Sequence, residues 1–165
     1  MRRVMTSLTA LTFALAPLAE AGAANCYGPA EATAVQVRML QSELMVGALA
    51  CRDSNPELGM IEQYNAFIHR LGDRLVSHSK ILQEHFQKQY GAASKRHMDT
   101  FVTALANDAS TRSMTAPNYC HGAAELFRNV SVLERRDLER FSAAHAVEVG
   151  APVMSCAGSA APAKK

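Results

Sequence analysis

The sequence predicts a single all-α domain: an antiparallel, up-down four-helix bundle with a short fifth helix, stapled by disulfides. Three observations lead to this fold class. Apolar residues recur at helical spacing in each main segment, the segments between them are short, and four cysteines follow a hydrophobic leader. No stretch of the chain indicates a sheet.

The first predicted helix, residues 31–52, is the one around which the others are expected to pack. Five apolar residues of this helix are spaced three or four positions apart, so they form a stripe along one helical face: Val37, Leu40, Leu44, Ala48 and Cys51. Further apolar residues widen that face: Met39, Met45, Val46 and Leu49. A helix that is apolar over so much of its surface is expected deep in the core.

The second predicted helix, residues 61–90, is the longest. Asn55 and Pro56 are expected to cap and open it, and Gly91 to end it. Its apolar stripe comprises Tyr64, Ile68, Leu71, Leu75, His78, Leu82 and then His85 or Phe86. At about 1.5 Å per residue, this helix is long enough to form the spine of the bundle.

Three more helices complete the prediction. Residues 95–113 form the third, with Met98, Phe101, Leu105 and Ala109 facing inward, and the fourth begins near Tyr119. Its inward residues are Cys120, Ala124, Phe127 and Val130. Ser131 and Glu134 have the spacing of a capping box for a fifth helix, residues 132–146, with Leu138 and Phe141 inward.

The domain organisation follows from the two ends of the chain. Residues 1–24 have two arginines, an apolar run and small residues near a cleavage point, which is typical of a secretory signal peptide. A twin-arginine route and acylation of Cys26 both fit less well, because Val4 and Asn25 stand where other residues are preferred. Residues 25–149 form the helical domain, and the Ala- and Pro-rich residues 150–165 are expected to be an extended or flexible tail.

Composition excludes several function classes. Of 17 basic and 15 acidic side chains, Arg2, Arg3 and Glu20 leave with the signal peptide, so the net charge falls from +2 to +1. This balance gives no indication of nucleic-acid binding. After the leader, no run approaches the roughly 20 apolar residues of a membrane span. An exported protein without a transmembrane segment is therefore predicted, periplasmic or secreted.

The four cysteines predict two disulfides. Cys51 ends the first helix, and Cys120 begins the fourth at the same end of an up-down bundle, so these two are expected to pair. Cys26 and Cys156 then remain, and their bond would tie the N-terminal segment to the tail. No C-x-x-C motif exists, which argues against thioredoxin-type chemistry and, with Pro117 three residues before Cys120, against covalent haem attachment.

Metal binding is one alternative function. His78 and His85 lie seven residues apart on the second helix, and with Met98 or Met39 they could form a soft transition-metal site. Two ligands seven residues apart are separated by about 10 Å of helical rise, which is far for a single ion. Structural roles are therefore favoured for both histidines, and no cofactor is predicted.

The end of the third helix is unusually polar. It contains Asn107, Asp108, Ser110 and Arg112, of which Asp108 and Arg112 are spaced for an i, i+4 ion pair. No motif that would activate a nucleophile surrounds this cluster. A buried polar network between helices is the favoured interpretation. Glu43 is a single carboxylate and lacks an E-x-x-H partner, so it gives no indication of a di-iron site.

Three segments carry a family resemblance: VRMLQSELMVGALAC, YNAFIHRL and FVTALANDASTRS, with Cys120 following. Over residues 37–141 the chain resembles a family of small exported bacterial helical proteins. The resemblance implies no activity, substrate or cofactor. It implies that the first helix, its cysteine and the polar end of the third helix belong together, which makes Cys51, Cys120, Asn107 and Ser110 the positions to test.

The leading functional hypothesis is a non-enzymatic envelope protein that acts by protein interaction or scaffolding, with another envelope protein as its partner. It requires an exposed apolar patch. The alternatives are the metal protein described above and a helical core that holds an apolar small molecule. A fully packed interior would argue against the last.

Overall fold

The computed structural model describes residues 26–151, 153, 155 and 156, and within them the fold is all-α. Five α-helices follow one another: α1 (Pro29–Cys51), α2 (Met60–Tyr90), α3 (Ser94–Thr115), α4 (Tyr119–Ser131) and α5 (Leu138–Glu148). Short 3-10 turns precede α2, α3 and α5: Pro56–Leu58, Gly91–Ala93 and Arg135–Asp137. The predicted all-α class is confirmed. The signal-peptide assignment and residues 157–165 of the tail lie outside the described residues.

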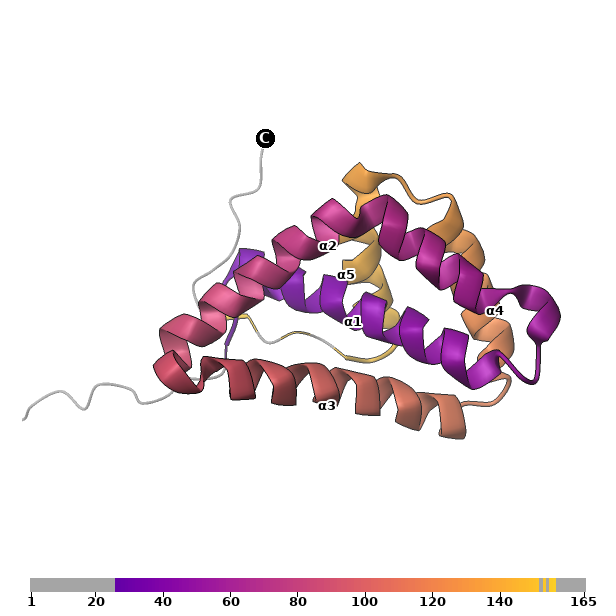
Figure 1. Ribbon diagram of the computed structural model, residues 1–165, viewed down its shortest axis with the longest axis horizontal. Coiled ribbons are helices and arrows are strands. Elements are labelled where there is room, and N and C mark those ends of the chain that lie inside the picture. The colour runs from indigo at the N-terminus through magenta and orange to yellow at the C-terminus, as the bar shows by residue number, and fades with distance from the viewer. Residues whose placement is uncertain (1–25, 152, 154, 157–165) are drawn as a thin grey trace, which may run out of the picture.

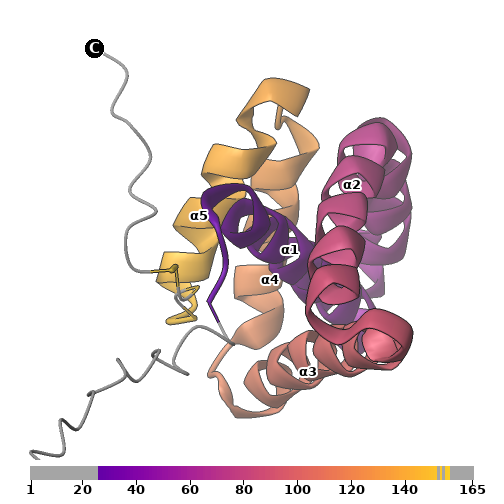
Figure 2. The same ribbon diagram turned by 90° about the vertical axis from the view of Figure 1, so that its left-hand side faces the viewer.

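Helix α2 runs antiparallel to both α1 and α3, which are parallel to each other, whereas α5 crosses α1 steeply (Figure 1). Viewed from one end, α1 lies in the middle, between α5 and α2 and above α3 (Figure 2). Each of the other four helices contacts α1. The architecture is therefore a central helix covered by four others.

The predicted stripe of α1 is the centre of the core. All five of its residues are buried, and they pack with Phe67, Leu71 and Leu75 of α2 and Phe127 of α4. A second, smaller cluster surrounds Ala34, Val35 and Leu82 at the other end of α1. The prediction that α1 is a core helix is confirmed, although Leu49 near its end is 54% exposed.

The predicted starts of α1 and α2 differ slightly from the observed ones, and the residues at the two starts explain the differences. Pro29 is already inside α1, where its missing N–H costs no hydrogen bond, and the Gly28 N–H donates to Glu31 Oε2 at 2.7 Å. Pro56 opens the 3-10 turn and not α2, which is preceded by Gly59 at φ 54°. Gly91, at φ 50°, ends α2 as predicted.

The predicted start of the fifth helix was wrong. Ser131 is the last residue of α4, and its hydroxyl donates to the Arg128 carbonyl at 2.7 Å instead of capping a new helix. A turn and a 3-10 segment intervene, so α5 begins only at Leu138. Leu138 is fully buried, as predicted, and Phe141 is half-buried.

Helix α3 is more peripheral than its sequence suggested. Of its four predicted inward residues only Ala109 is buried, and the other three are half-buried. Helix α3 therefore depends less on apolar packing than α1 or α2, and polar contacts have more weight in fixing its position.

Both predicted disulfides are present. Cys51 and Cys120 join the end of α1 to the start of α4, with their Cα atoms 5.6 Å apart. Cys26 and Cys156 join the segments outside the helices, with their Cα atoms 4.8 Å apart. The Cys156 N–H also donates to the Tyr27 carbonyl at 3.1 Å. This part of the tail is thus held against the domain, contrary to a wholly flexible tail.

Removing the bond between α1 and α4 is expected to destabilise the fold strongly. It closes a loop with a sequence separation of 69 residues, for which the chain-entropy model gives about 4 kcal/mol. The double variant Cys51→Ala/Cys120→Ala should lose that much unfolding free energy in urea titrations followed by circular dichroism. The oxidised wild-type protein is the reference, and the reduced, alkylated wild-type protein, which lacks both bonds, should be at least as unstable as the variant. A loss below about 1 kcal/mol would contradict the prediction.

Candidate functional site

A cavity of about 350 Å³ lies where α1, α4, α5 and the end of α3 meet. Most of its lining is apolar, and a few polar side chains converge on it. The lining residues that the following argument uses are Glu43, Arg112, Tyr119, Gly122, His145 and Glu148.

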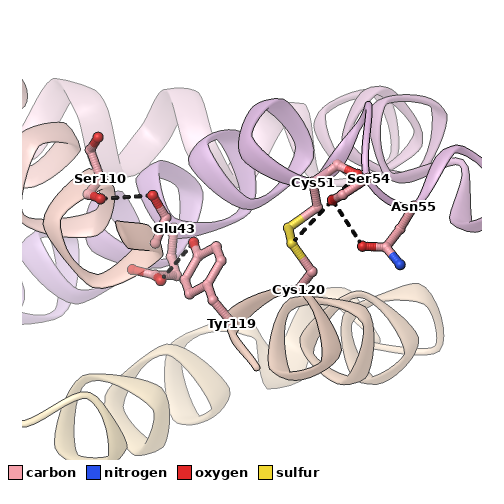
Figure 3. The surroundings of a disulfide bond; sticks show 8 residues. Glu43, Cys51, Ser54, Asn55, Ser110, Tyr119 and Cys120 are labelled. Carbon is pink, nitrogen blue, oxygen red and sulfur yellow. Dashed lines mark hydrogen bonds between the residues drawn. A yellow bond between two sulfur atoms is a disulfide. The ribbon is translucent and has the colours of Figure 1, made fainter. Parts of the chain in front are cut away.

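Glu43 is the centre of the polar part of this cavity. It lies on α1 and its side chain is only 7% exposed. Arg112 of α3 donates to Glu43 Oε2 from Nη2 at 2.6 Å and from Nε at 3.2 Å. Tyr119 of α4 donates its hydroxyl to Glu43 Oε1 at 3.2 Å (Figure 3). Both carboxylate oxygens are therefore satisfied, by two different helices.

The electrostatics of this network keep the Tyr119 hydroxyl protonated. Burial and then the charge of Glu43 raise the pKa of Tyr119 far above its ordinary value of 10, against a smaller opposing effect of Arg112. Tyr119 is thus a permanent hydrogen-bond donor to Glu43 over the physiological pH range.

His145 of α5 is the fourth member of the cluster. Its Nδ1 lies 4.0 Å from Glu148 Oε2, and its buried Nε2 has no hydrogen-bond partner among the described residues. Burial lowers the pKa of His145 below its ordinary value of 6.5; Glu43 and Glu148 oppose this shift and Arg112 adds to it. The imidazole is therefore neutral at neutral pH.

A close approach of two helices lets Tyr119 reach Glu43. Gly47 lies one turn after Glu43 on α1, and a Cβ there would lie 3.3 Å from the Ala123 Cβ and 3.7 Å from the Tyr119 hydroxyl. The absence of a side chain at Gly47 thus allows α4 to pack directly on α1. The disulfide at Cys120, the residue next to Tyr119, fixes the first turn of α4 at the same place (Figure 3).

The predicted polar cluster of α3 is only partly assembled. Arg112 joins the buried network, but it pairs with Glu43 and not with Asp108. Asn107 and Asp108 are exposed. Ser110 is half-buried, and its carbonyl accepts a hydrogen bond from Ser113 Oγ at 2.7 Å. The expectation of a polar network between helices holds for one residue of the four.

Sequence reasoning missed three residues of the site: Glu43, Tyr119 and His145. A signal existed for Glu43, because it stands between Leu40 and Leu44 in the most apolar helix, where a carboxylate needs a partner. Neither Tyr119 nor His145 had such a signal, since both lie at the edge of short amphipathic helices.

The geometry that the metal hypothesis needed is not formed. His78 Nε2 lies 2.9 Å from Glu139 on α5, whereas His85 Nδ1 lies 3.1 Å from Glu31 on α1. The two imidazoles therefore face different carboxylates, and Met98 packs against the smaller apolar cluster. Within the described part of the chain, no group of three or more His, Cys, Asp or Glu side chains could hold a metal ion.

Each of these two histidines instead contacts a carboxylate of a neighbouring helix. Burial raises the pKa of Glu139, but hydrogen bonds from His78 and Arg74 outweigh it and hold that pKa below 4.5. The contact connects α2 to α5, and the contact of His85 with Glu31 connects α2 to α1.

Comparisons with models of known families, with curated proteins and with solved structures gave no match. The family resemblance stated from the sequence stays a prediction. Among the described helices, none combines the length and apolar character needed to cross a bilayer.

Removing the guanidinium should leave an uncompensated buried charge. Arg112→Met is expected to lower the unfolding free energy by roughly 3 kcal/mol, and Glu43→Leu/Arg112→Met should restore much of the loss. Urea titrations at neutral pH measure both. Arg128→Met, at a 61% exposed arginine of α4, is the matched control and should change stability by less than about 0.5 kcal/mol. An equally small effect of Arg112→Met would refute the role assigned to the pair.

His145 should make the protein less stable on mild acidification. Its folded pKa lies below 6.5, so the unfolded chain binds the proton first as pH falls. The contribution of the neutral imidazole is therefore complete above about pH 6.5 and decreases below it. The unfolding free energy of His145→Gln, measured from pH 7.5 to 5, should fall less steeply than that of the wild type. His121→Gln, at a 75% exposed side chain, should keep the wild-type slope.

Proposed function

We propose that this is an exported, non-enzymatic protein that binds a small amphipathic molecule in the cavity between α1, α4 and α5. The observation that carries the proposal is the cavity itself. Its volume of about 350 Å³ falls within the range of ligand pockets, and such pockets combine an apolar lining with a few placed polar groups. Here the polar groups are Tyr119 and the Glu43–Arg112 pair.

Export is the second part of the proposal. Two disulfides are stable in an oxidising compartment, and both bonds occur in this domain. The apolar leader in residues 1–24 supports the same location, periplasmic or secreted.

The interaction hypothesis for an envelope partner has less support. It needs a contiguous apolar patch, and none is defined among the described residues, whose exposed large apolar side chains are Leu49, Val76, Met114, Val132 and Val147. An envelope partner stays a prediction, whereas the ligand hypothesis has a defined site.

A cavity-filling variant tests ligand binding. A Cβ at Gly122 of α4 meets no atom within 4 Å, so Gly122→Phe should occlude the cavity without distorting the helix. The neutral fluorescent probe N-phenyl-1-naphthylamine should bind the wild type saturably, and this variant at least roughly tenfold more weakly, a difference of about 1.4 kcal/mol.

The control is Gly72→Phe, because Gly72 of α2 also has open space at its Cβ but lies outside the cavity. Its probe affinity should equal that of the wild type, and thermal melts should show both variants folded. Absence of saturable binding to the wild type, or an equal loss in both variants, would refute the proposed function.

A further inference from the structure

We infer that the ligand of this cavity is a neutral carbonyl compound, whose oxygen accepts hydrogen bonds from the guanidinium of Arg112 and whose body is aromatic or branched aliphatic. The inference rests on the proposed function and adds the chemical class of the ligand. It follows from three properties of the lining: the unused donors of Arg112, the balance of charge around them and the accessible apolar side chains.

The guanidinium of Arg112 has donors that no residue uses. Glu43 occupies only one edge of it, through Nε and Nη2. The N–H groups of Nη1 and the second N–H of Nη2 have no acceptor among the described residues. Nη1 is also accessible, because the buried unpartnered nitrogens of the described chain belong to Arg38, His78 and His145 and not to Arg112. The side chain of Arg112 is 27% exposed. A ligand can therefore reach these donors.

The guanidinium lies among residues of the cavity wall. It contacts Glu43 of α1 at 2.6 Å. Its charge opposes the rise in the pKa of Tyr119 on α4 that burial and Glu43 cause. On α5 it adds to the lowering of the pKa of His145, for which burial is the main cause. All three residues line the cavity, so the unused donors of Arg112 lie where the helices around the cavity meet.

The charges of the lining favour a neutral ligand. Among the described residues that line the cavity, Arg112 is the only arginine or lysine, and Glu43 neutralises it. An anionic head would therefore find no uncompensated cation. Glu125 and Glu148 are 56% and 81% exposed, so water screens them and they do not form a site for a cationic head.

The hydrogen-bonding pattern favours an acceptor on the ligand. Both carboxylate oxygens of Glu43 already accept hydrogen bonds, and Tyr119 gives its proton to one of them. What remains at the Glu43–Arg112 pair is the fork of N–H groups on Nη1 and Nη2. A guanidinium is planar and rigid, so one carbonyl oxygen can accept from both nitrogens of this fork.

The remaining lining fits an apolar body. Leu126 and Phe141 line the cavity and are half-buried, so they offer accessible apolar surface. Tyr119 adds the face of a half-buried ring, and aromatic faces cover apolar groups well. A volume of about 350 Å³ suits a ligand of on the order of a dozen non-hydrogen atoms. A short aromatic or branched ketone, ester or amide has this size.

Three probes with one skeleton separate the head group from the body: the ketone 4-phenylbutan-2-one, the hydrocarbon (3-methylbutyl)benzene and the anion 3-phenylpropanoate. Displacement of N-phenyl-1-naphthylamine from the mature, disulfide-bonded protein at pH 7.5 measures their affinities. The anion should bind at least roughly tenfold more weakly than the ketone. An anion that binds as tightly as the ketone would overturn the inference and leave the proposed function intact.

A double variant locates the donor. In Glu43→Leu/Arg112→Met, the affinity of the ketone relative to the hydrocarbon should fall about tenfold, because a hydrogen bond to a charged group is lost. Arg128→Met, at an exposed arginine of α4 outside the cavity, should keep the wild-type ratio. An unchanged ratio in the double variant, or an equal loss in Arg128→Met, would overturn the role of Arg112.

Infrared spectra of the ketone, isotope-labelled at its carbonyl, test the same contact in the wild type. The carbonyl stretch of the bound ketone should lie at or below its frequency in water, since charged donors form the stronger hydrogen bonds. A frequency equal to that in hexane would overturn the inference. If the ketone fails to bind while the naphthylamine probe binds, only the inference about the carbonyl fails; if that probe also fails, the proposed function fails with it.

Discussion

The central position of α1 constrains the rest of the structure. This helix is covered by α2, α3 and α5 on different sides (Figure 2) and also contacts α4. The apolar stripe from Val37 to Cys51 makes such burial favourable. A covered helix has little outward face on which a charged residue could reach water. Any ionisable side chain in the middle of α1 must therefore find its partners on the surrounding helices.

Glu43 meets this requirement and thereby positions two helices. It is the only buried carboxylate among the described residues, and its partners come from α3 and α4. A buried ion pair contributes little net stability compared with apolar packing, but its directionality can select one arrangement. This matters most for α3, whose only fully buried residue is Ala109. The side chain of Arg112 therefore provides a positional constraint that apolar packing of α3 alone would not.

Helix number, apolar faces and disulfide pairing were all readable from the sequence, because each depends on local periodicity or on the direction of short connections. The stripes of α1 and α2 are examples, and the pairing of Cys51 with Cys120 followed from the antiparallel order. The start of α5 was missed because Ser131 found an acceptor within α4. A serine at such a position can either cap a new helix or end the preceding one, and the sequence pattern alone does not distinguish these two cases.

The candidate site was much less predictable than the fold. Arg112 was singled out, but sequence spacing paired it with Asp108, four residues away on the same helix, whereas its partner lies 69 residues away on α1. Helical periodicity identifies which face of a helix is buried but not which residue of another helix it meets. For the same reason, the spacing of His78 and His85 suggested one shared site, although the two residues face α5 and α1.

The cavity shows how the same packing that fixes Glu43 leaves space beside it. Gly47 and Ala123 bring α1 and α4 into direct contact near Tyr119. Two further lining residues, Gly122 on α4 and Ala144 on α5, are also small and leave volume that larger side chains would fill. Unfilled space costs stability. The bond between Cys51 and Cys120 opposes that cost by restricting the unfolded chain, and it anchors α4 next to Tyr119 (Figure 3). A covalent constraint at this end of the bundle is therefore compatible with a ligand-sized space beside a rigid polar cluster.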